Sequence, residues 1–177
     1  VEGLFDQPYA IPHYRVRGYA ADVGIPVGFW RSVGASHNGF IHESFIDELA
    51  HAAGRDPLEF RLDLVRPESA VAAGVLEAVR DMSGWDQPKA PGTGRGVAMV
   101  WSFGTPVAEV VEVVDEGGRI RIARGWIACW CANTNSRPAA NACCRGKRSP
   151  RWPAMHGRDA SHAGWPMPNA RARPPPC

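Results

Sequence analysis

The chain has 177 residues, of which 45% are hydrophobic and 21% are charged, and its formal net charge is +2. These averages are typical of one soluble globular domain and exclude a collagen-like chain. No stretch approaches the roughly 18 consecutive apolar residues of a membrane-spanning helix. The chain begins at Val1 rather than at Met, so we expect further sequence upstream.

The averages conceal a change in composition at residue 129. The last 49 residues contain no Leu, Ile, Val, Phe or Tyr, although about 12 are expected at ordinary usage. They carry 8 basic and 1 acidic residue, or +7, which leaves 12 basic and 17 acidic residues, or −5, in residues 1–128. We therefore expect residues 1–128 to form the core. The mildly basic pI averages two unlike segments, so we draw no inference about nucleic acid from it and expect no nucleic-acid partner.

The N-terminal residues 1–35 are predicted to form extended chain and turns, with a short strand-like run over 14–19. Next comes the run GIPVGFWRSVGASHNGF, in which four glycines surround Trp30 and Arg31. Glycine at this density lets the backbone turn with positive φ or approach another group closely.

Three helices are predicted after this run. The first covers about 36–53, with Gly54 as its C-terminal cap. The second covers 57–65 after Asp56, which is a typical N-cap, and the third covers 70–82. The apolar residues of the first helix that follow the helical period, and that we expect to face the core, are Phe40, Ile41, Phe45, Leu49 and Ala53.

The pattern then changes to that of β-strands. The runs GVAMVWSF, VAEVVEVV and RIRIARGWIA are rich in β-branched and aromatic residues, and Glu116-Gly117-Gly118 is a suitable hairpin turn. The only charges of the middle run are Glu109 and Glu112, so we expect much of that strand to be buried. The order of elements predicts an α+β fold whose strands form an antiparallel meander.

The segment GFWRSVGASHNGFIHESFIDELAHAAGRDPLEFRLDLV resembles a known protein family. It is similar to the molybdenum-binding large subunit of the xanthine dehydrogenase and aldehyde oxidase family, closest to the branch typified by the isoquinoline 1-oxidoreductase beta subunit. The resemblance includes VEGLFDQPYAIPHYRV before this segment and SGWDQP, GTGRGVAM and FGTPVAEVVEV after it. It covers residues 1–128, which are expected to be part of a molybdopterin-binding domain.

The resemblance implies a molybdenum–molybdopterin cofactor, in the cytosine dinucleotide form. It also implies iron–sulfur clusters on a small (2Fe–2S) partner subunit, and substrates that are N-heterocycles or aldehydes hydroxylated with water as the oxygen source. In the family an arginine followed by a glycine-bearing turn lies against the cofactor. The residues that match this segment are Arg31, Ser32, Val33 and Gly34. Alternatively, Arg31 is an ordinary arginine at the end of a strand, and the glycines serve only turns.

The sequence also departs from the family. The catalytic glutamate in its GVGEP-type setting and the GGGFG-type loop are absent from the sequence. Glu43, Glu48 and Glu59 lie in helical patterns and are expected to be solvated or structural acids. We therefore expect no catalytic residue in this chain, no stable binding of the cofactor and no turnover by the chain alone.

The resemblance ends close to Cys129, and residues 129–177 are interpreted as translated in a shifted reading frame. Codons rich in G and C give the Ala, Pro, Arg and Gly that fill this segment. A zinc module remains an alternative, but Cys129-x-Cys131 and the adjacent Cys143 and Cys144 lack the usual C-x₂₋₄-C spacing. A basic disordered tail is the other alternative.

Histidines and tryptophans close to these motifs have ordinary structural explanations. His37 and His42 flank the glycine turn and are expected to be half-exposed helical residues, and His51 is expected on a helix surface. Trp85, Trp101 and Trp126 are expected to pack in or against the core.

The sequence therefore leaves two functions open. The chain is either a fragment of a molybdenum hydroxylase subunit or a non-catalytic product, such as a truncated gene product or a small interaction module with a basic tail. The sequence leaves the compartment open between cytoplasm and periplasm.

Overall fold

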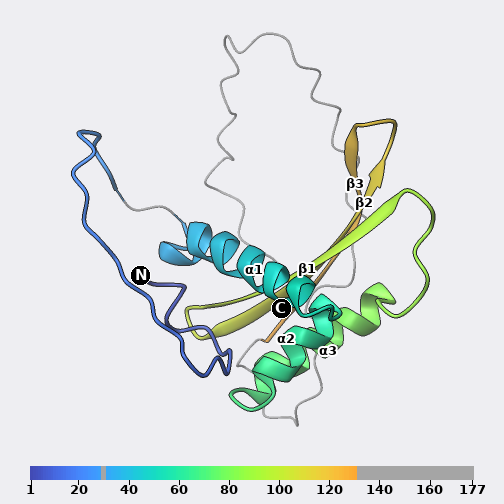
Figure 1. Ribbon diagram of the computed structural model, residues 1–177, viewed down its shortest axis with the longest axis horizontal. Helices are drawn as coiled ribbons and strands as arrows, with labels where there is room; N and C mark the ends of the chain where they lie inside the picture. The colour runs from blue at the N-terminus through green and yellow to red at the C-terminus, as the bar shows by residue number, and fades with distance from the viewer. Residues whose placement is uncertain (29–30, 131–177) are drawn as a thin grey trace, which may run out of the picture.

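The computed structural model describes residues 1–28 and 31–130. Three helices are followed by three strands (Figure 1), which confirms the α+β prediction. The expected disorder of the tail concerns residues that lie outside the described part, apart from Cys129 and Trp130. No helix of the described part is long and apolar enough to cross a membrane. The elements are α1 (Gly34–Ala52), α2 (Pro57–Val65), α3 (Ala70–Ser83), β1 (Thr93–Ser102), β2 (Thr105–Asp115) and β3 (Ile120–Cys129).

The ends of the helices follow the signals in the sequence. The Asp56 side chain accepts hydrogen bonds from the Leu58 and Glu59 amides at 2.9 and 3.0 Å, which caps α2. Gly54, just after α1, has φ 62°, and Gly84 ends α3 in the left-handed region at φ 59°. Glycine adopts this conformation without the steric penalty of a Cβ, so both helices end where predicted.

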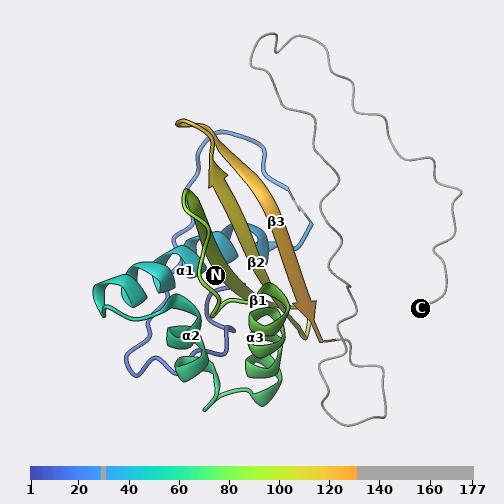
Figure 2. The ribbon, with the colours of Figure 1, turned by 90° about the vertical axis from the view of Figure 1, so that its right-hand side faces the viewer.

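The strands form one antiparallel sheet in the order β1-β2-β3, with an irregularity in the β2–β3 register between Glu112 and Val113. The β2–β3 hairpin projects beyond the helices (Figures 1 and 2). α3 packs on β2 and β3, while α2 lies against α3 and β1. Together α2 and α3 cover one face of the sheet.

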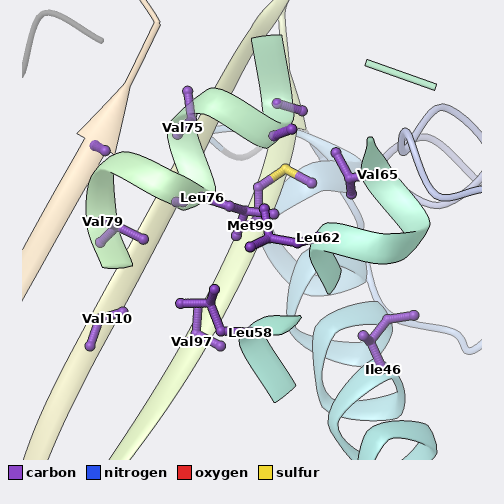
Figure 3. Close-up of a cluster of buried hydrophobic side chains, with 14 of the residues drawn as sticks. Ile46, Leu58, Leu62, Val65, Val75, Leu76, Val79, Val97, Met99 and Val110 are labelled. Carbon is purple, nitrogen blue, oxygen red and sulfur yellow. The ribbon is translucent and has the colours of Figure 1, made fainter. Parts of the chain in front are cut away.

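The core lies between this face and the two helices. Val97 pairs with Val110 across β1 and β2, and Met99 pairs with Ala108 in the next row that faces the same way. All four side chains are at most 4% exposed. They meet apolar side chains of the helices that are fully or almost fully buried (Figure 3), namely Ile46, Leu58, Leu62, Val65, Val75, Leu76 and Val79.

α1 buries a different face from the predicted one. Phe40, Ile41 and Phe45 are 76%, 55% and 55% exposed. The helical period was right, but the face was wrong, because buried polar groups of α1 find partners on the other side. The buried residues of α1 are Gly34, Ala35, Gly39, His42, Glu43, Ile46 and Ala50.

The N-terminal segment forms no strand in its described part, so the strand-like run predicted over 14–19 is wrong. Tyr14 and Tyr19 are exposed there and have no neighbouring strand with which to pair. Gln7, however, makes two hydrogen bonds to the edge of β1. Its amide nitrogen donates to the Trp101 carbonyl at 3.1 Å, and its amide oxygen accepts from the Trp101 N–H at 2.8 Å. A side chain thus satisfies backbone groups that a further strand would otherwise take.

Candidate functional site

A strained turn leads into α1. Ser32 and Val33 have φ angles of 62° and 43°, which is unusual for residues other than glycine and especially for the β-branched Val33. Such conformations cost about 1–3 kcal/mol each and occur most often at functional sites. Val33 occupies the N-cap position of α1 without a side-chain hydrogen bond to the first turn. The first amide groups of α1 therefore lack the side-chain cap that α2 and α3 possess.

The turn is held in place by the first residues of the chain. A Cβ built on Gly34 would overlap the Glu2 carbonyl, and a Cβ on Gly3 would lie 2.7 Å from the Ala35 Cα. The Asn38 side chain donates a hydrogen bond to the Glu2 carbonyl at 2.7 Å. The two glycines therefore allow two backbone segments to touch, and the position of the turn depends on this contact.

A cavity of about 400 Å³ lies beside this turn and is lined in part by Val33, Gly34 and His37. The N-terminus of a helix carries a partial positive charge that favours an anion. Arg31 and Ser32 directly precede Val33 in the chain and are exposed but do not line the cavity, and among the lining residues Glu2 is the acidic one. These residues fit an anionic group such as a phosphate, with a cation and backbone amides as donors. The remaining lining residues are Val1, Gly28 and Asn38.

A buried polar network lies further along α1, and the sequence did not predict it. Glu43 is 4% exposed and Arg61 is fully buried. The Arg61 Nε donates to Glu43 Oε2 at 2.8 Å, and its guanidinium also reaches Asp47 at 2.6 Å. The Tyr9 hydroxyl donates to Glu43 Oε1 at 2.8 Å, and the Met99 amide donates to Oε2 at 2.9 Å. One carboxylate thus joins the N-terminal segment, α1, α2 and β1.

The environment of Glu43 keeps it ionised. Burial raises the pKa of its carboxyl, but His42, the Arg61 guanidinium and the Met99 amide together outweigh burial and lower that pKa below its ordinary value. Burial and the Glu43 charge raise the pKa of the Tyr9 hydroxyl, so Tyr9 stays protonated and acts as a donor. Of the predicted alternatives for Glu43, the structural acid is confirmed and the solvated acid is wrong.

His42 is buried, not half-exposed as predicted, because α1 turns this side chain inward. It is 5% exposed, and its ring lies 5.1 Å from the Tyr9 ring and 6.0 Å from the Tyr14 ring, measured between centroids. Its Nδ1 is 3.5 Å from Glu43 Oε1. Neither ring nitrogen has a hydrogen-bond partner within the described residues.

The other histidines, acids and tryptophans considered in the sequence have ordinary structural positions. His37 is exposed rather than half-exposed, and His51 lies on the surface of α1 as predicted. Glu48 is exposed and Glu59 forms an ion pair with Arg80. The tryptophans that pack against the core, as predicted, are Trp85, Trp101 and Trp126.

A second ionic network lies on the sheet. Glu112 is 4% exposed and accepts hydrogen bonds from Arg95 at 2.8 Å and from Arg124 at 2.6 Å. Burial opposes its ionisation, but these two guanidinium groups lower the pKa of Glu112. Glu109, on the opposite face of the same strand, is exposed, so the predicted burial of β2 holds for Glu112 and not for Glu109. Over residues 1–28 and 31–130, no three His, Cys, Asp or Glu side chains gather to hold a metal ion.

Comparison with known proteins identifies the relatives of this chain. Residues 2–64 match the family described as the molybdopterin cofactor-binding domain. The B subunit of nicotinate dehydrogenase from Pseudomonas putida is 36% identical over 84 residues, which cover 48% of this chain and 7% of that protein. The beta subunit of isoquinoline 1-oxidoreductase from Brevundimonas diminuta is 28% identical over 127 residues, which cover 68% of this chain and 16% of that protein.

The chain thus spans only a small part of either relative. The family match nevertheless includes the turn before α1, the whole of α1, and both Glu43 and Arg61. Through this segment the chain is similar to the molybdopterin cofactor-binding domain family, and over a longer stretch it is similar to the two dehydrogenase and oxidoreductase subunits.

Proposed function

We propose that residues 31–34 contact an anionic group of the molybdenum cofactor, and that the chain is part of the cofactor-binding subunit of a molybdenum hydroxylase. The observation that carries this proposal is the uncapped N-terminus of α1, which follows the strained Ser32–Val33 turn inside the matched segment. Backbone amides at a helix N-terminus bind phosphate oxygens well, and Arg31 would add a charge-assisted contact.

In this proposal each residue binds or orients, and none reacts. Arg31 attracts the anion from an exposed position, while Val33 and Gly34 present backbone N–H groups. Gly34 also permits the contact with Glu2 that fixes the turn. The cofactor, when bound, supplies the redox chemistry at molybdenum. We further propose the cytosine dinucleotide form of the cofactor and a (2Fe–2S) subunit as the electron-accepting partner.

The proposed substrates are N-heterocycles or aldehydes. The names of the two relatives support the first class, because nicotinate and isoquinoline are both N-heterocycles. The chain alone is proposed to be inactive, because the glutamate setting expected from the resemblance does not occur in its sequence. A fragment whose frame shifts near residue 129 accounts for the change in composition there.

Because stable binding of the whole cofactor is not expected from the chain alone, a titration of the purified chain with excess cytidine diphosphate tests for weak binding at the proposed contact, with cytidine as the probe that lacks phosphate. Amide resonances of residues 34–36 are expected to shift with the diphosphate and not with cytidine. Arg31→Ala should weaken the binding, whereas Arg55→Ala, an exposed arginine paired with Asp63, should not. Equal shifts with both probes, or no effect of Arg31→Ala, would contradict the proposal.

A second candidate is a non-catalytic product, which the composition of residues 129–177 favours. The coding DNA distinguishes the two. A shifted frame that restores Leu-, Ile- and Val-rich sequence, with a GVGEP-type segment downstream, supports the enzyme fragment. An intact frame shared by many short relatives supports the non-catalytic product.

A further inference from the structure

The face of α1 that carries its large apolar side chains has no partner in the described residues. Phe40, Ile41 and Phe45 are all more than half exposed, although helical residues of this kind normally face a core. The opposite face of α1 is already occupied by the Glu43 network and by Ile46. The helix therefore presents a second face, with Glu48 among its large apolar side chains, that the described part of the chain does not cover.

One face of the sheet is also uncovered by the described residues, except where α1 meets β1. Side chains of a strand alternate between the two faces, and the rows that contain Met99, Val97 and Glu112 point toward α2 and α3. The rows between them point the other way. These rows are Val100–Val107–Cys129, Ala98–Glu109–Ile127, Gly96–Val111–Gly125 and Gly94–Val113–Ile122.

The two surfaces meet in a groove of about 230 Å³ between α1 and β1. Phe40 and Gly39 line it from α1, and Ala98 and Val100 line it from the sheet. A Cβ on Gly39 would lie 3.0 Å from Val100, so the helix and the strand are in close contact at its floor. The groove makes the exposed face of α1 and the uncovered side of the sheet one continuous surface, which we name the open face.

Glu109 is the single charged residue in the four sheet rows of the open face, while Glu48 is exposed on its α1 side and Asp47 lines the groove, where it pairs with Arg61. Its neighbours across the strands are Ala98 and Ile127. No hydrogen bond or ion pair to its carboxylate occurs within the described residues, whereas Glu112 on the covered face has two arginine partners. Although Glu109 is exposed, partial desolvation by its apolar neighbours raises the pKa of its carboxyl.

A cation from another molecule would complement the Glu109 carboxylate. Large apolar side chains that are exposed together on one surface often mark an interaction site. A second copy of the open face would bring two Glu109 carboxylates together, and like charges oppose such an arrangement. We propose that the open face binds an apolar protein segment with an Arg or Lys placed to pair with Glu109.

Selection from a library of 12-residue peptides displayed on phage tests this proposal without assuming a sequence. The bait is the full chain, as wild type and as Glu109→Gln, Glu109→Lys and Glu116→Lys. Glu116 lies on the hairpin tip, pairs with Arg121 and is a matched control far from the groove. Peptides selected on the wild type should be apolar with one basic residue, and synthetic copies should bind Glu109→Gln about tenfold more weakly.

The charge-reversal variant Glu109→Lys tests the proposal more sharply than Glu109→Gln. Selection on Glu109→Lys should yield apolar peptides with an acidic residue, while Glu116→Lys should yield the wild-type class. Val111→Asp should weaken the binding of every selected peptide. Unchanged thermal midpoints of the variants would exclude unfolding as the cause. The proposal is overturned if no peptides are enriched, if their charge does not follow residue 109, or if sedimentation shows a dimer that survives Glu109→Lys.

Discussion

The Glu43 carboxylate and the Arg61 guanidinium meet inside the domain at 2.8 Å, and this ion pair ties α1 to α2. The same carboxylate accepts the Met99 amide at the edge of β1 and the Tyr9 hydroxyl of the N-terminal segment. Because Arg61 also donates to the Glu43 backbone carbonyl at 3.0 Å, it holds the helix as well as the side chain. The orientation of α1, and with it the turn at residues 31–34, depends on this pair.

Removing one partner of the Glu43–Arg61 ion pair should therefore strongly destabilise the fold. Arg61→Ala leaves Glu43 ionised and buried without its cation, which typically costs about 3–5 kcal/mol in the free energy of unfolding. The double variant Glu43→Leu/Arg61→Met removes both charges and should cost less than Arg61→Ala alone. Urea unfolding followed by circular dichroism measures both. Arg55→Ala, which breaks an exposed pair, should stay within about 0.5 kcal/mol of the wild type. If Arg61→Ala were equally mild, the pair would not hold the helices together.

The pH dependence of the free energy of unfolding should reflect the ionisation of the buried carboxylates Glu43 and Glu112. The folded pKa values of Glu43 and Glu112 lie below their unfolded values, so both residues stabilise the fold above the unfolded pKa. This stability should be lost as the pH falls through their folded pKa values. Glu112→Gln should flatten the acid limb of a plot of unfolding free energy against pH. A limb of unchanged slope would show that the two arginines do not stabilise ionised Glu112.

Glu109 should behave in the opposite sense. Partial desolvation by apolar neighbours raises its folded pKa, so its ionisation works against the fold above that pKa. Glu109→Gln in the isolated chain is expected to keep or slightly raise the free energy of unfolding at pH 7. A clear loss of stability would mean that Glu109 has a partner within the chain.

Much of the fold follows from local signals in the sequence. Asp56 and Gly84 mark helix ends because their capping chemistry involves only neighbouring residues. The exposed stripe of α1 could not be predicted in this way. Apolar spacing predicted that Phe40 and Phe45 face the core, whereas the partners that draw Glu43 inward lie 18 and 56 residues away.

The candidate site could likewise be predicted only in part from the sequence. The glycine-rich run predicted a close backbone approach, and Gly34 makes one, although its partner Glu2 could not be foreseen. The positive φ of Val33 carried no sequence signal, because a β-branched residue predicts extended chain. For the buried network, an acid in one predicted helix and an arginine in the next were a usable signal. Each of these residue types is also common on a solvated surface, so the signal did not single out a buried pair.

Two glycine substitutions should have effects of opposite sign. Gly34→Ala places a methyl group against the Glu2 carbonyl, so it should displace the N-terminal segment and lower the thermal midpoint. Gly74→Ala, in the middle of α3 with no atom within 4 Å of the new Cβ, should stabilise the protein by about 0.5–1 kcal/mol. Scanning calorimetry of both variants measures this contrast. A neutral Gly34→Ala would show that the contact with Glu2 does not fix the turn.

The cofactor contact of Arg31 is the central claim, and the molybdenum content of one variant tests it most directly. The subunit is produced with its reading frame restored and with its iron–sulfur partner, as wild type, Arg31→Ala and Arg55→Ala. A hydrogen bond to a charged group is worth roughly 1.5–3 kcal/mol, which corresponds to about a 10- to 100-fold loss of cofactor affinity. We expect Arg31→Ala to lose molybdenum at an unchanged thermal midpoint, and Arg55→Ala to retain it. Full molybdenum in Arg31→Ala, or a loss that only follows unfolding, would contradict the assignment of residues 31–34 to the cofactor.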